Sequence, residues 1–255
     1  MLDKWYFDCT SPEGDALIGY AARLTWGPLT LNYGARITMP NDGPLSQKRS
    51  LAFGRVDETP GFIAWRNDAL GIEGSWTGGD AISATTVVDE PSGTIEWQCL
   101  SANAAVEIRV DGRTIIGKGY AEKLTVTIPL GRLPLTELRW GRYISEDRSD
   151  YVVWIDVSGK TPRTWIWVNS GERADGTVDD RGVRTDSAEL TFGASRALRE
   201  ENVARTLLGR AAFLRRLLPS GLRDIREAKR VSSCVLRHHG SESAGFSVNE
   251  VVRWR

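Results

Sequence analysis

The first feature suited to chemistry is a glutamate on the apolar face of a predicted β-strand. Over residues 120–128 the side chains alternate between a mostly apolar and a mostly polar face, because successive side chains of a strand point to opposite sides. Glu122 falls on the apolar face, together with Tyr120, Leu124, Val126 and Ile128. A carboxylate in such surroundings must be paired, hydrogen-bonded or protonated, because burying an isolated charge is too costly.

Other carboxylates have comparable neighbours. Glu250 lies on the apolar face of the last predicted strand, 245–254, and Asp156 interrupts the apolar run Val152–Val157. For Asp156, a hydrogen bond at the end of a strand is the structural alternative. Asp8 follows aromatic residues near the start of the chain, where a barrel plug or an edge strand would also explain it.

Two roles stay open for these carboxylates. Pairing with arginine would make a glutamate structural, and Arg139 and Arg142, on the strand predicted over 137–144, are the obvious partners. A desolvated glutamate would instead have a raised pKa and could donate a proton near neutral pH. Replacing Glu122 by glutamine separates the two roles, because only the first predicts a large loss of stability.

Sequence motifs for cofactors and metals are missing. The chain has no Walker loop, no dinucleotide-binding glycine pattern, no Gly-x-Ser-x-Gly and no His-Glu-x-x-His. Its two histidines, His238 and His239, are adjacent and would point to opposite faces of a strand. The cysteines share no ligand spacing, which favours free thiols in a reducing compartment. We therefore expect no metal and no cofactor.

The elements that position these residues are predicted to be mainly β-strands. Many segments alternate with period two and end at Gly, Pro, Asn or Asp, which is typical of half-buried strands. Asp111-Gly112 is the clearest hairpin turn, because both residues tolerate the positive φ angles of such turns. One segment differs: residues 198–218 have leucines at helical spacing before Pro219 and Gly221. We expect an all-β chain with one helix over 198–218.

Charge and hydropathy restrict the partners and the compartment. Lys plus Arg and Asp plus Glu both total 33, so no net charge favours nucleic acid, and we expect no nucleic-acid partner. Basic residues exceed acidic ones over 191–255, which predicts a solvated helix face, with peripheral membrane contact as the alternative. No run approaches the ~18 apolar residues of a transmembrane helix, and the start lacks a signal-peptide core. We expect a cytoplasmic protein.

Three strings contain most of these residues: Gly117–Glu122, Leu138–Tyr143 and Val153–Asp156. Together they resemble a known group, the carotenoid 1,2-hydratase (hydroxyneurosporene synthase) and AttH-like family. The opening residues 4–8 and the closing residues 249–254 also resemble the ends of that family. The resemblance therefore covers most of the chain, and its strings are specific together rather than singly.

This resemblance implies a lipocalin-like (calycin) antiparallel barrel, often built as two barrel-like halves. We place the halves at 1–128 and 129–255, with one continuous domain as the alternative. Carotenoid hydratases protonate a terminal isoprenoid double bond, and relatives of the fold cyclise or isomerise polyenes, terpenoids and polyketides. Such chemistry needs a carboxylic acid to start the cation and aromatic faces to stabilise it.

Taken together, the residues and the resemblance predict a binder of an extended apolar molecule. Catalysis would be a cofactor-free, acid-initiated isomerisation, cyclisation or hydration. A non-catalytic carrier of the same ligand class and a purely structural protein are the alternatives. Glu122 is the first candidate acid, followed by Asp156 and Glu250. The candidate ligand-lining residues are Tyr20, Trp97, Tyr120, Arg139, Trp140, Arg142, Tyr143 and Trp154.

Overall fold

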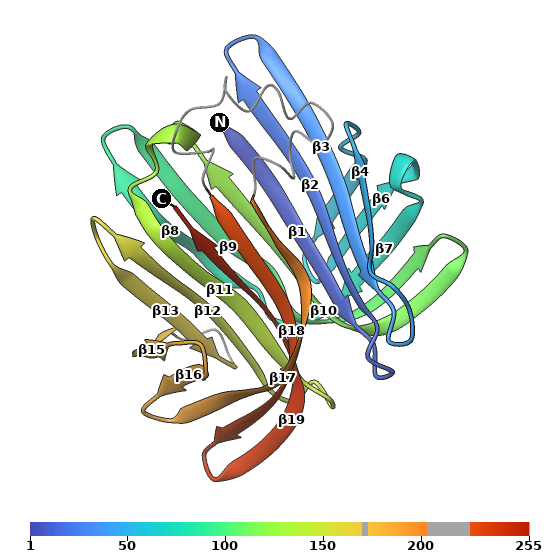
Figure 1. Cartoon of the computed structure of the whole chain (residues 1–255), viewed down its shortest axis with the longest axis vertical. Helices are drawn as coiled ribbons and strands as arrows, with labels where there is room; N and C mark the ends of the chain where they lie inside the picture. The colour runs from blue at the N-terminus through green and yellow to red at the C-terminus, as the bar shows by residue number, and fades with distance from the viewer. Residues whose placement is uncertain (170–172, 203–224, 255) are drawn as a thin grey trace. The chain divides into compact units, whose positions relative to one another are not determined.

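The structure is a computed structural model that describes residues 1–169, 173–202 and 225–254. It consists of two compact units, Met1–Ile128 and Pro129–Arg255, which are described separately below. Both are built from antiparallel strands (Figure 1). Over the described residues the helical turns are two 3-10 turns, η1 (Asp68–Leu70) and η2 (Leu130–Arg132). The prediction of a mainly antiparallel β protein is confirmed.

Unit 1 is one ten-stranded sheet. The order is β4-β3-β2-β1-β10-β9-β7-β6-β5, with β8 paired to β9 outside this path. The first and last long strands are therefore neighbours near the middle of the sheet. The strands are β1 (Leu2–Thr10), β2 (Ala16–Trp26), β3 (Leu29–Met39), β4 (Ser46–Ser50), β5 (Arg55–Thr59), β6 (Phe62–Asn67), β7 (Ile72–Thr77), β8 (Ile82–Glu90), β9 (Gly93–Val110) and β10 (Arg113–Val126).

One face of this sheet carries an apolar core cluster of unit 1. Phe7 of β1 stacks on Trp65 with ring centroids 5.3 Å apart, and its centroid lies 4.8 Å from that of Trp76. The indole N–H of Trp76 donates to the backbone oxygen of Asp8 at 2.8 Å, which satisfies the polar atom of a completely buried ring. Because side chains alternate along β1, the residues on either side of Phe7 point to the opposite face.

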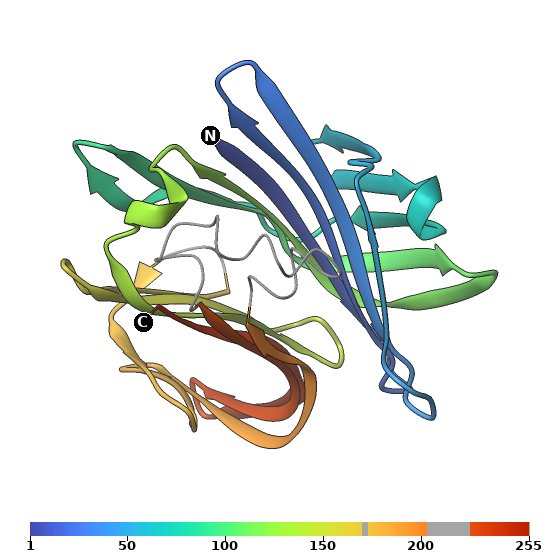
Figure 2. The same cartoon turned by 45° about the horizontal axis from the view of Figure 1, so that its top comes forward.

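Unit 2 is a nine-stranded sheet of order β14-β13-β12-β11-β19-β18-β17-β16-β15. The sheet curls into a nearly closed barrel, in which β13 approaches β15 (Figure 2). The strands are β11 (Leu135–Ser145), β12 (Tyr151–Gly159), β13 (Arg163–Val168), β14 (Arg173–Ala174), β15 (Gly176–Val178), β16 (Gly182–Thr185), β17 (Ala188–Asn202), β18 (Arg226–His238) and β19 (Ser241–Arg253).

Both faces of β12 are buried. The five residues Tyr151–Ile155 are each exposed by 2% or less. Val152 and Trp154 point into the apolar core cluster of unit 2, whereas the intervening residues point to the other face. A strand covered on both sides needs apolar residues throughout, which explains the unbroken apolar run in its sequence.

The hairpin predicted at Asp111-Gly112 is confirmed. Val110 pairs with Arg113 across the turn between β9 and β10, and the two turn residues have φ angles of 47° and 79°. Positive φ at both central positions is the backbone of a primed turn, whose twist matches that of the flanking strands. This turn sets the register of β9 and β10 as far as Gly119, and register shifts between Gly119 and Glu122 then bring Glu122 opposite Cys99.

The predicted helix over 198–218 is wrong at its start. Leu198–Asn202 continue β17, and Arg199 pairs with Lys229 of β18 in the sheet register. Leu198 is buried, and the guanidinium of Arg199 contacts the carboxylate of Glu227. These long-range contacts override the helical propensity of Leu, Arg and Glu. The remainder of the predicted helix, 203–218, lies outside the described residues.

Replacing Gly141 by alanine is expected to destabilise the protein by about 1–3 kcal/mol, the range for overpacking a core. Gly141 faces Trp154 across β11 and β12, and a Cβ there would overlap the indole ring. Urea denaturation followed by tryptophan fluorescence measures the change. Trp154→Phe removes the overlapped part of the ring. The double variant should therefore lose less stability than the sum of the single losses, and additive losses would contradict the overlap.

Candidate functional site

The candidate site lies on the face of the unit 1 sheet opposite the cluster of Phe7, Trp65 and Trp76. The antiparallel register of β1 and β10 pairs Tyr6 with Glu122 and Asp8 with Tyr120. On the other side of β1, Tyr20 of β2 pairs with Tyr6. Paired residues of antiparallel strands share a face, so these five side chains form one group. All five are buried.

Glu122 is held by two hydrogen-bond donors. The indole Nε1 of Trp97 donates to its Oε2 at 2.5 Å, and the Tyr120 hydroxyl donates to the same oxygen at 2.9 Å. Trp97 belongs to β9, the other neighbour of β10, and Glu122 itself is 5% exposed. Two donors at one oxygen orient the carboxyl group and stabilise its charged form.

Asp8 is the second carboxylate of the group and is 0% exposed. The Tyr6 hydroxyl donates to its Oδ2 at 3.1 Å. Its backbone oxygen accepts the indole N–H of Trp76 from the core side of the sheet. The core therefore fixes the backbone at Asp8 while the carboxylate points to the opposite face.

The tyrosine and the thiol beside Glu122 are neutral at pH 7. Burial raises the pKa of Tyr120 well above its usual value, and the nearby Cys99 and Glu122 raise it further. Burial likewise raises the pKa of the Cys99 thiol. Cys99 pairs with Glu122 in the register of β9 and β10. Tyr120 therefore acts as a proton-carrying hydrogen-bond donor, and Cys99 is not a thiolate nucleophile.

Four residues predicted from the sequence meet in this group: Tyr20, Trp97, Tyr120 and Glu122. Tyr6 was missed, and Asp8 was noted without a place in the site. Alternation in the opening segment could have placed Tyr6 and Asp8 on one face. Only the pairing of β1 with β10 brings that face to Glu122.

The other predicted residues belong to unit 2, on two different faces. Tyr143 and Trp154 lie in its apolar core, where the Tyr143 hydroxyl donates to the Ser243 backbone oxygen at 2.8 Å. Burial raises the pKa of Tyr143 to about 12. Trp140 and Arg142 are also buried, on the opposite face of β11, because they alternate with Tyr143.

Asp156 and Arg139 have partners of their own inside unit 2. The half-buried carboxylate of Asp156 accepts the hydroxyl of its cross-strand partner Thr164 at 2.7 Å, within β12 rather than at its end. Arg139 forms ion pairs with Glu137 and Asp180, both at 2.6 Å. Pairing of Glu122 with an arginine stays a prediction.

Glu250 belongs to a buried ionic network rather than to the group around Glu122. The ammonium of Lys229 contacts the carboxylate of Glu250 and lies 3.0 Å from Glu227. Arg199 Nη1 lies 3.4 Å from the other oxygen of Glu227. Burial raises the pKa of Glu227, but the charges of Lys229 and Arg199 outweigh this effect and lower it to about 2. An ion-paired Glu250 is poorly suited to donate a proton at neutral pH.

Acid should weaken this network. The pKa of Glu227 is lower in the folded protein than its ordinary value of 4.5. Its contribution to stability is therefore fully present above about pH 4.5 and is lost as the pH falls towards about 2. Urea midpoints measured between pH 6 and pH 3 should fall with pH in the wild type. The fall should be smaller in Glu227→Gln, and equal slopes would contradict the assignment.

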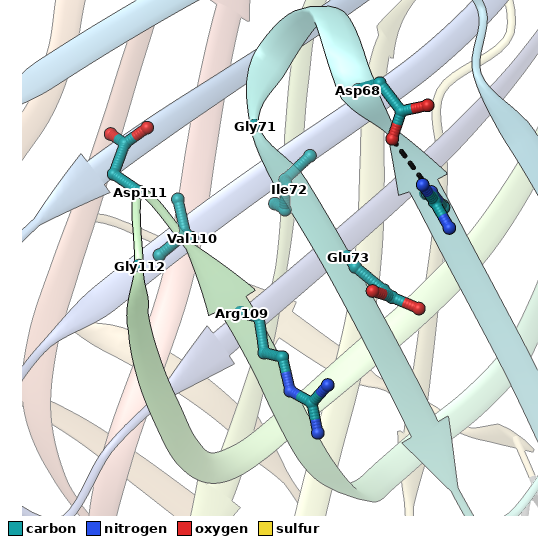
Figure 3. Close-up of a pocket in the computed structure, with 9 residues that line it drawn as sticks. Asp68, Gly71, Ile72, Glu73, Arg109, Val110, Asp111 and Gly112 are labelled. Carbon is teal, nitrogen blue, oxygen red and sulfur yellow. Dashed lines mark hydrogen bonds and ion pairs between the residues drawn. The ribbon is translucent and has the colours of Figure 1, made fainter.

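A surface pocket of unit 1 lies apart from the candidate site. It has a volume of about 250 Å³ and opens between η1, β7 and the β9–β10 turn (Figure 3). Arg66 and Asp68 form an ion pair at its edge, 2.8 Å apart. Hydrogen bonds from Lys48 and Arg36 lower the pKa of Asp111, which also lines it. Its charged, exposed lining does not suit an apolar ligand.

Two further kinds of feature, metal-ligand clusters and membrane-spanning helices, concern only the part of the chain that the structure describes. Within residues 1–169, 173–202 and 225–254, no group of three or more His, Cys, Asp or Glu side chains could hold a metal ion. In the same ranges, no helix has the length and apolar character needed to cross a membrane.

Comparisons with known proteins show the fold. No family model matches the chain, and no curated protein matches it. An AttH-like protein from Nitrosomonas europaea matches with a TM-score of 0.58 and 14% identity, over 98% of this chain and 91% of that one. Kievitone hydratase from Nectria haematococca matches with a TM-score of 0.58 and 11% identity, over 99% and 88% of the two chains.

A third structure, CghA, matches with a TM-score of 0.57 and 11% identity, over 99% of this chain and 88% of CghA. These likenesses confirm the prediction of a lipocalin-like fold, shared with an AttH-like protein and a hydratase. Because the sequence identities are low, the structural likenesses show the fold alone. The assignment to a family stays a prediction.

Proposed function

We propose that the protein binds an extended apolar molecule of polyene, terpenoid or polyketide type and catalyses a cofactor-free proton-transfer reaction on it. The reaction class is isomerisation, cyclisation or hydration, and Glu122 is the principal proton-transfer group. One observation carries the proposal: a buried carboxyl group, oriented by Trp97 and Tyr120, stands among aromatic rings on the face of the sheet opposite the cluster of Phe7, Trp65 and Trp76.

The surroundings of Glu122 suit a reaction that passes through a carbocation. The Tyr6 ring lies edge-on to those of Tyr20 and Tyr120, with centroids 5.5 Å and 6.2 Å away. Aromatic rings attract cations through their negative faces, and a carboxylate in a water-poor site stabilises positive charge strongly. A group of this kind supplies both the proton transfer and the stabilisation of the intermediate.

The fold adds support of a general kind. The chain shares its fold with a kievitone hydratase over 99% of its own length. Adding water to a double bond can begin with protonation, which is the step that a buried carboxyl group performs. In unit 2, Trp140 and Arg142 are proposed as further ligand contacts, whereas the core positions of Tyr143 and Trp154 favour a packing role.

The experiment uses farnesol as the probe, because it is an extended terpenoid with a terminal trisubstituted double bond. Protein in D₂O is titrated with farnesol by tryptophan fluorescence, and the recovered probe and its isomers are analysed by mass spectrometry for deuterium. We expect wild type to bind the probe and introduce deuterium. Glu122→Gln should bind it with a rate of exchange reduced at least about 100-fold.

Glu107→Gln is the matched control, because Glu107 is an exposed glutamate of β9 and should exchange like wild type. Binding without deuterium in wild type would overturn catalysis and identify a carrier. Undiminished exchange in Glu122→Gln would overturn the role of this residue. Failure of the wild type to bind farnesol would overturn the proposed ligand class.

A further inference from the structure

The hairpin of β2 and β3 extends beyond the neighbouring strands of the unit 1 sheet (Figure 1). β1 pairs with β2 as far as Leu24, and β4 pairs with β3 only from Gly34 onward. Residues 26–32 therefore form a two-stranded arm, which ends in a turn at Gly27-Pro28. Over the described residues, no strand pairs with the outer edge of β3 at 29–32. The arm is thus joined to the sheet at its base.

One face of the arm is apolar and exposed. Leu31 pairs with Leu24 across the hairpin, and Leu29 lies two positions along β3 on the same face. Leu29 is 67% exposed and Leu31 is 53% exposed. The opposite face carries the polar Thr30 and Asn32. Transfer of the two leucines from water to an apolar environment is favourable, so this face is suited to contact with such an environment.

The arm carries no charge, and cations stand at its base. From residue 24 to residue 35 the sequence has no Asp, Glu, Lys or Arg. Lys4 of β1 lies at the base on the face of the leucines, and the exposed Arg23 of β2 lies on the other face. Asp3 is opposite Arg23, but its carboxylate accepts a hydrogen bond from the Thr125 hydroxyl at 2.9 Å. An uncharged tip with basic side chains behind it matches the boundary between the acyl chains and the anionic headgroups of a bilayer.

Ile116 provides a comparison, because exposure alone does not make such a face. Ile116 is 68% exposed, but it lies opposite the charged Glu107 of β9. Single exposed apolar residues are common on protein surfaces. Leu29 and Leu31 differ from Ile116 because they are neighbours on one face and because no charged residue belongs to their arm.

The small size of this face favours a bilayer over a second copy of the chain. A stable dimer buries roughly 800 Å² per partner, and two leucines with the exposed Pro28 supply far less. A bilayer needs no minimum area, because each inserted leucine adds its own transfer free energy. We propose that the β2–β3 arm docks on a lipid bilayer, with Leu29 and Leu31 among the acyl chains and Arg23 and Lys4 at anionic headgroups.

Co-sedimentation with vesicles of phosphatidylcholine and phosphatidylglycerol tests the docking. We expect the wild type to bind these vesicles and to bind pure phosphatidylcholine more weakly. Leu29→Asn and Leu31→Asn should each lower the affinity at least about 10-fold. Ile116→Asn is the matched control and should bind like wild type. Since all three side chains are exposed, the variants should unfold at denaturant midpoints close to that of wild type. Arg23→Gln should lower the affinity for the anionic vesicles alone, by about fivefold.

A fluorescent label shows which part of the protein meets the vesicle. The native cysteines Cys9, Cys99 and Cys234 are buried, so an added exposed cysteine reacts selectively. Pro28→Cys, labelled with a polarity-sensitive nitrobenzoxadiazole dye, should shift its emission to the blue when anionic vesicles are added. The same label in Thr114→Cys should not shift, because Thr114 is exposed at the opposite end of β10.

Three results would overturn the inference: no binding to anionic vesicles, an equal loss of affinity in Ile116→Asn, or a blue shift of both labels. A wild-type dimer in sedimentation velocity that Leu31→Asn dissociates would identify a second copy as the occupant instead of a bilayer. The inference is independent of the proposed function. Glu122→Gln should bind vesicles like wild type, and loss of docking in Leu29→Asn should leave deuterium transfer to dissolved farnesol unchanged.

Discussion

Replacing Lys229 by methionine is expected to destabilise the protein by about 3–5 kcal/mol, the range for breaking a buried ion pair from one side. Lys229 is 2% exposed and its ammonium contacts the carboxylates of both Glu227 and Glu250. Methionine fills a similar volume but leaves two buried negative charges with one cation fewer. The residual charge, rather than a loss of packing, causes the expected loss.

Chemical denaturation followed by tryptophan fluorescence measures this effect. Arg230→Met is the matched control, because the adjacent Arg230 is 51% exposed and pairs with the exposed Glu200 at 3.4 Å. An exposed pair contributes about 0–1 kcal/mol. Adding Glu250→Gln to Lys229→Met removes one of the stranded charges and should restore part of the stability. A Lys229→Met protein as stable as the control would contradict the network.

Replacing Glu122 by glutamine is expected to reduce turnover by about 10²–10⁴-fold, the contribution of a positioned acid or base. The stability of the protein should change by less than about 1 kcal/mol, within the range of tolerated substitutions. Glutamine keeps an oxygen that accepts the hydrogen bonds of Trp97 and Tyr120, but it cannot exchange a proton.

The competing expectation from the sequence is a structural ion pair between Glu122 and Arg139 or Arg142. In that case glutamine would leave a buried arginine charge and lower the free energy of unfolding by about 3–5 kcal/mol. Denaturation midpoints of wild type, Glu122→Gln and Glu107→Gln separate the two expectations before a substrate is known. A large loss of stability would identify a structural role, and a small one leaves the proton-transfer role in place.

Local patterns in the sequence determined the strands and the inward direction of particular residues. Alternation predicted that Glu122 is on a buried face, and it is 5% exposed. The Asp111-Gly112 turn was readable because positive φ is a local property of the backbone. The apolar run of β12 was also visible in the sequence, since a strand covered on both faces needs apolar residues at successive positions.

Only the tertiary structure decided which of these faces meet. Leu198–Asn202 have the residue types of a helix, yet this end of β17 pairs with β18. The contacts that stabilise the pairing are with residues distant in sequence, so the local sequence does not reveal them. Likewise, Glu250 reads as an inward carboxylate, but its partner Lys229 lies on another strand.

Asp8 illustrates the same limit at the candidate site. Its own segment shows an acidic residue among aromatic ones, and nothing local connects it to Glu122 more than a hundred residues later. The connection comes from the pairing of β1 with β10, the first and last long strands of unit 1. Side-chain direction is a local consequence of strand geometry, whereas the choice of neighbouring strand depends on the burial of the whole sheet.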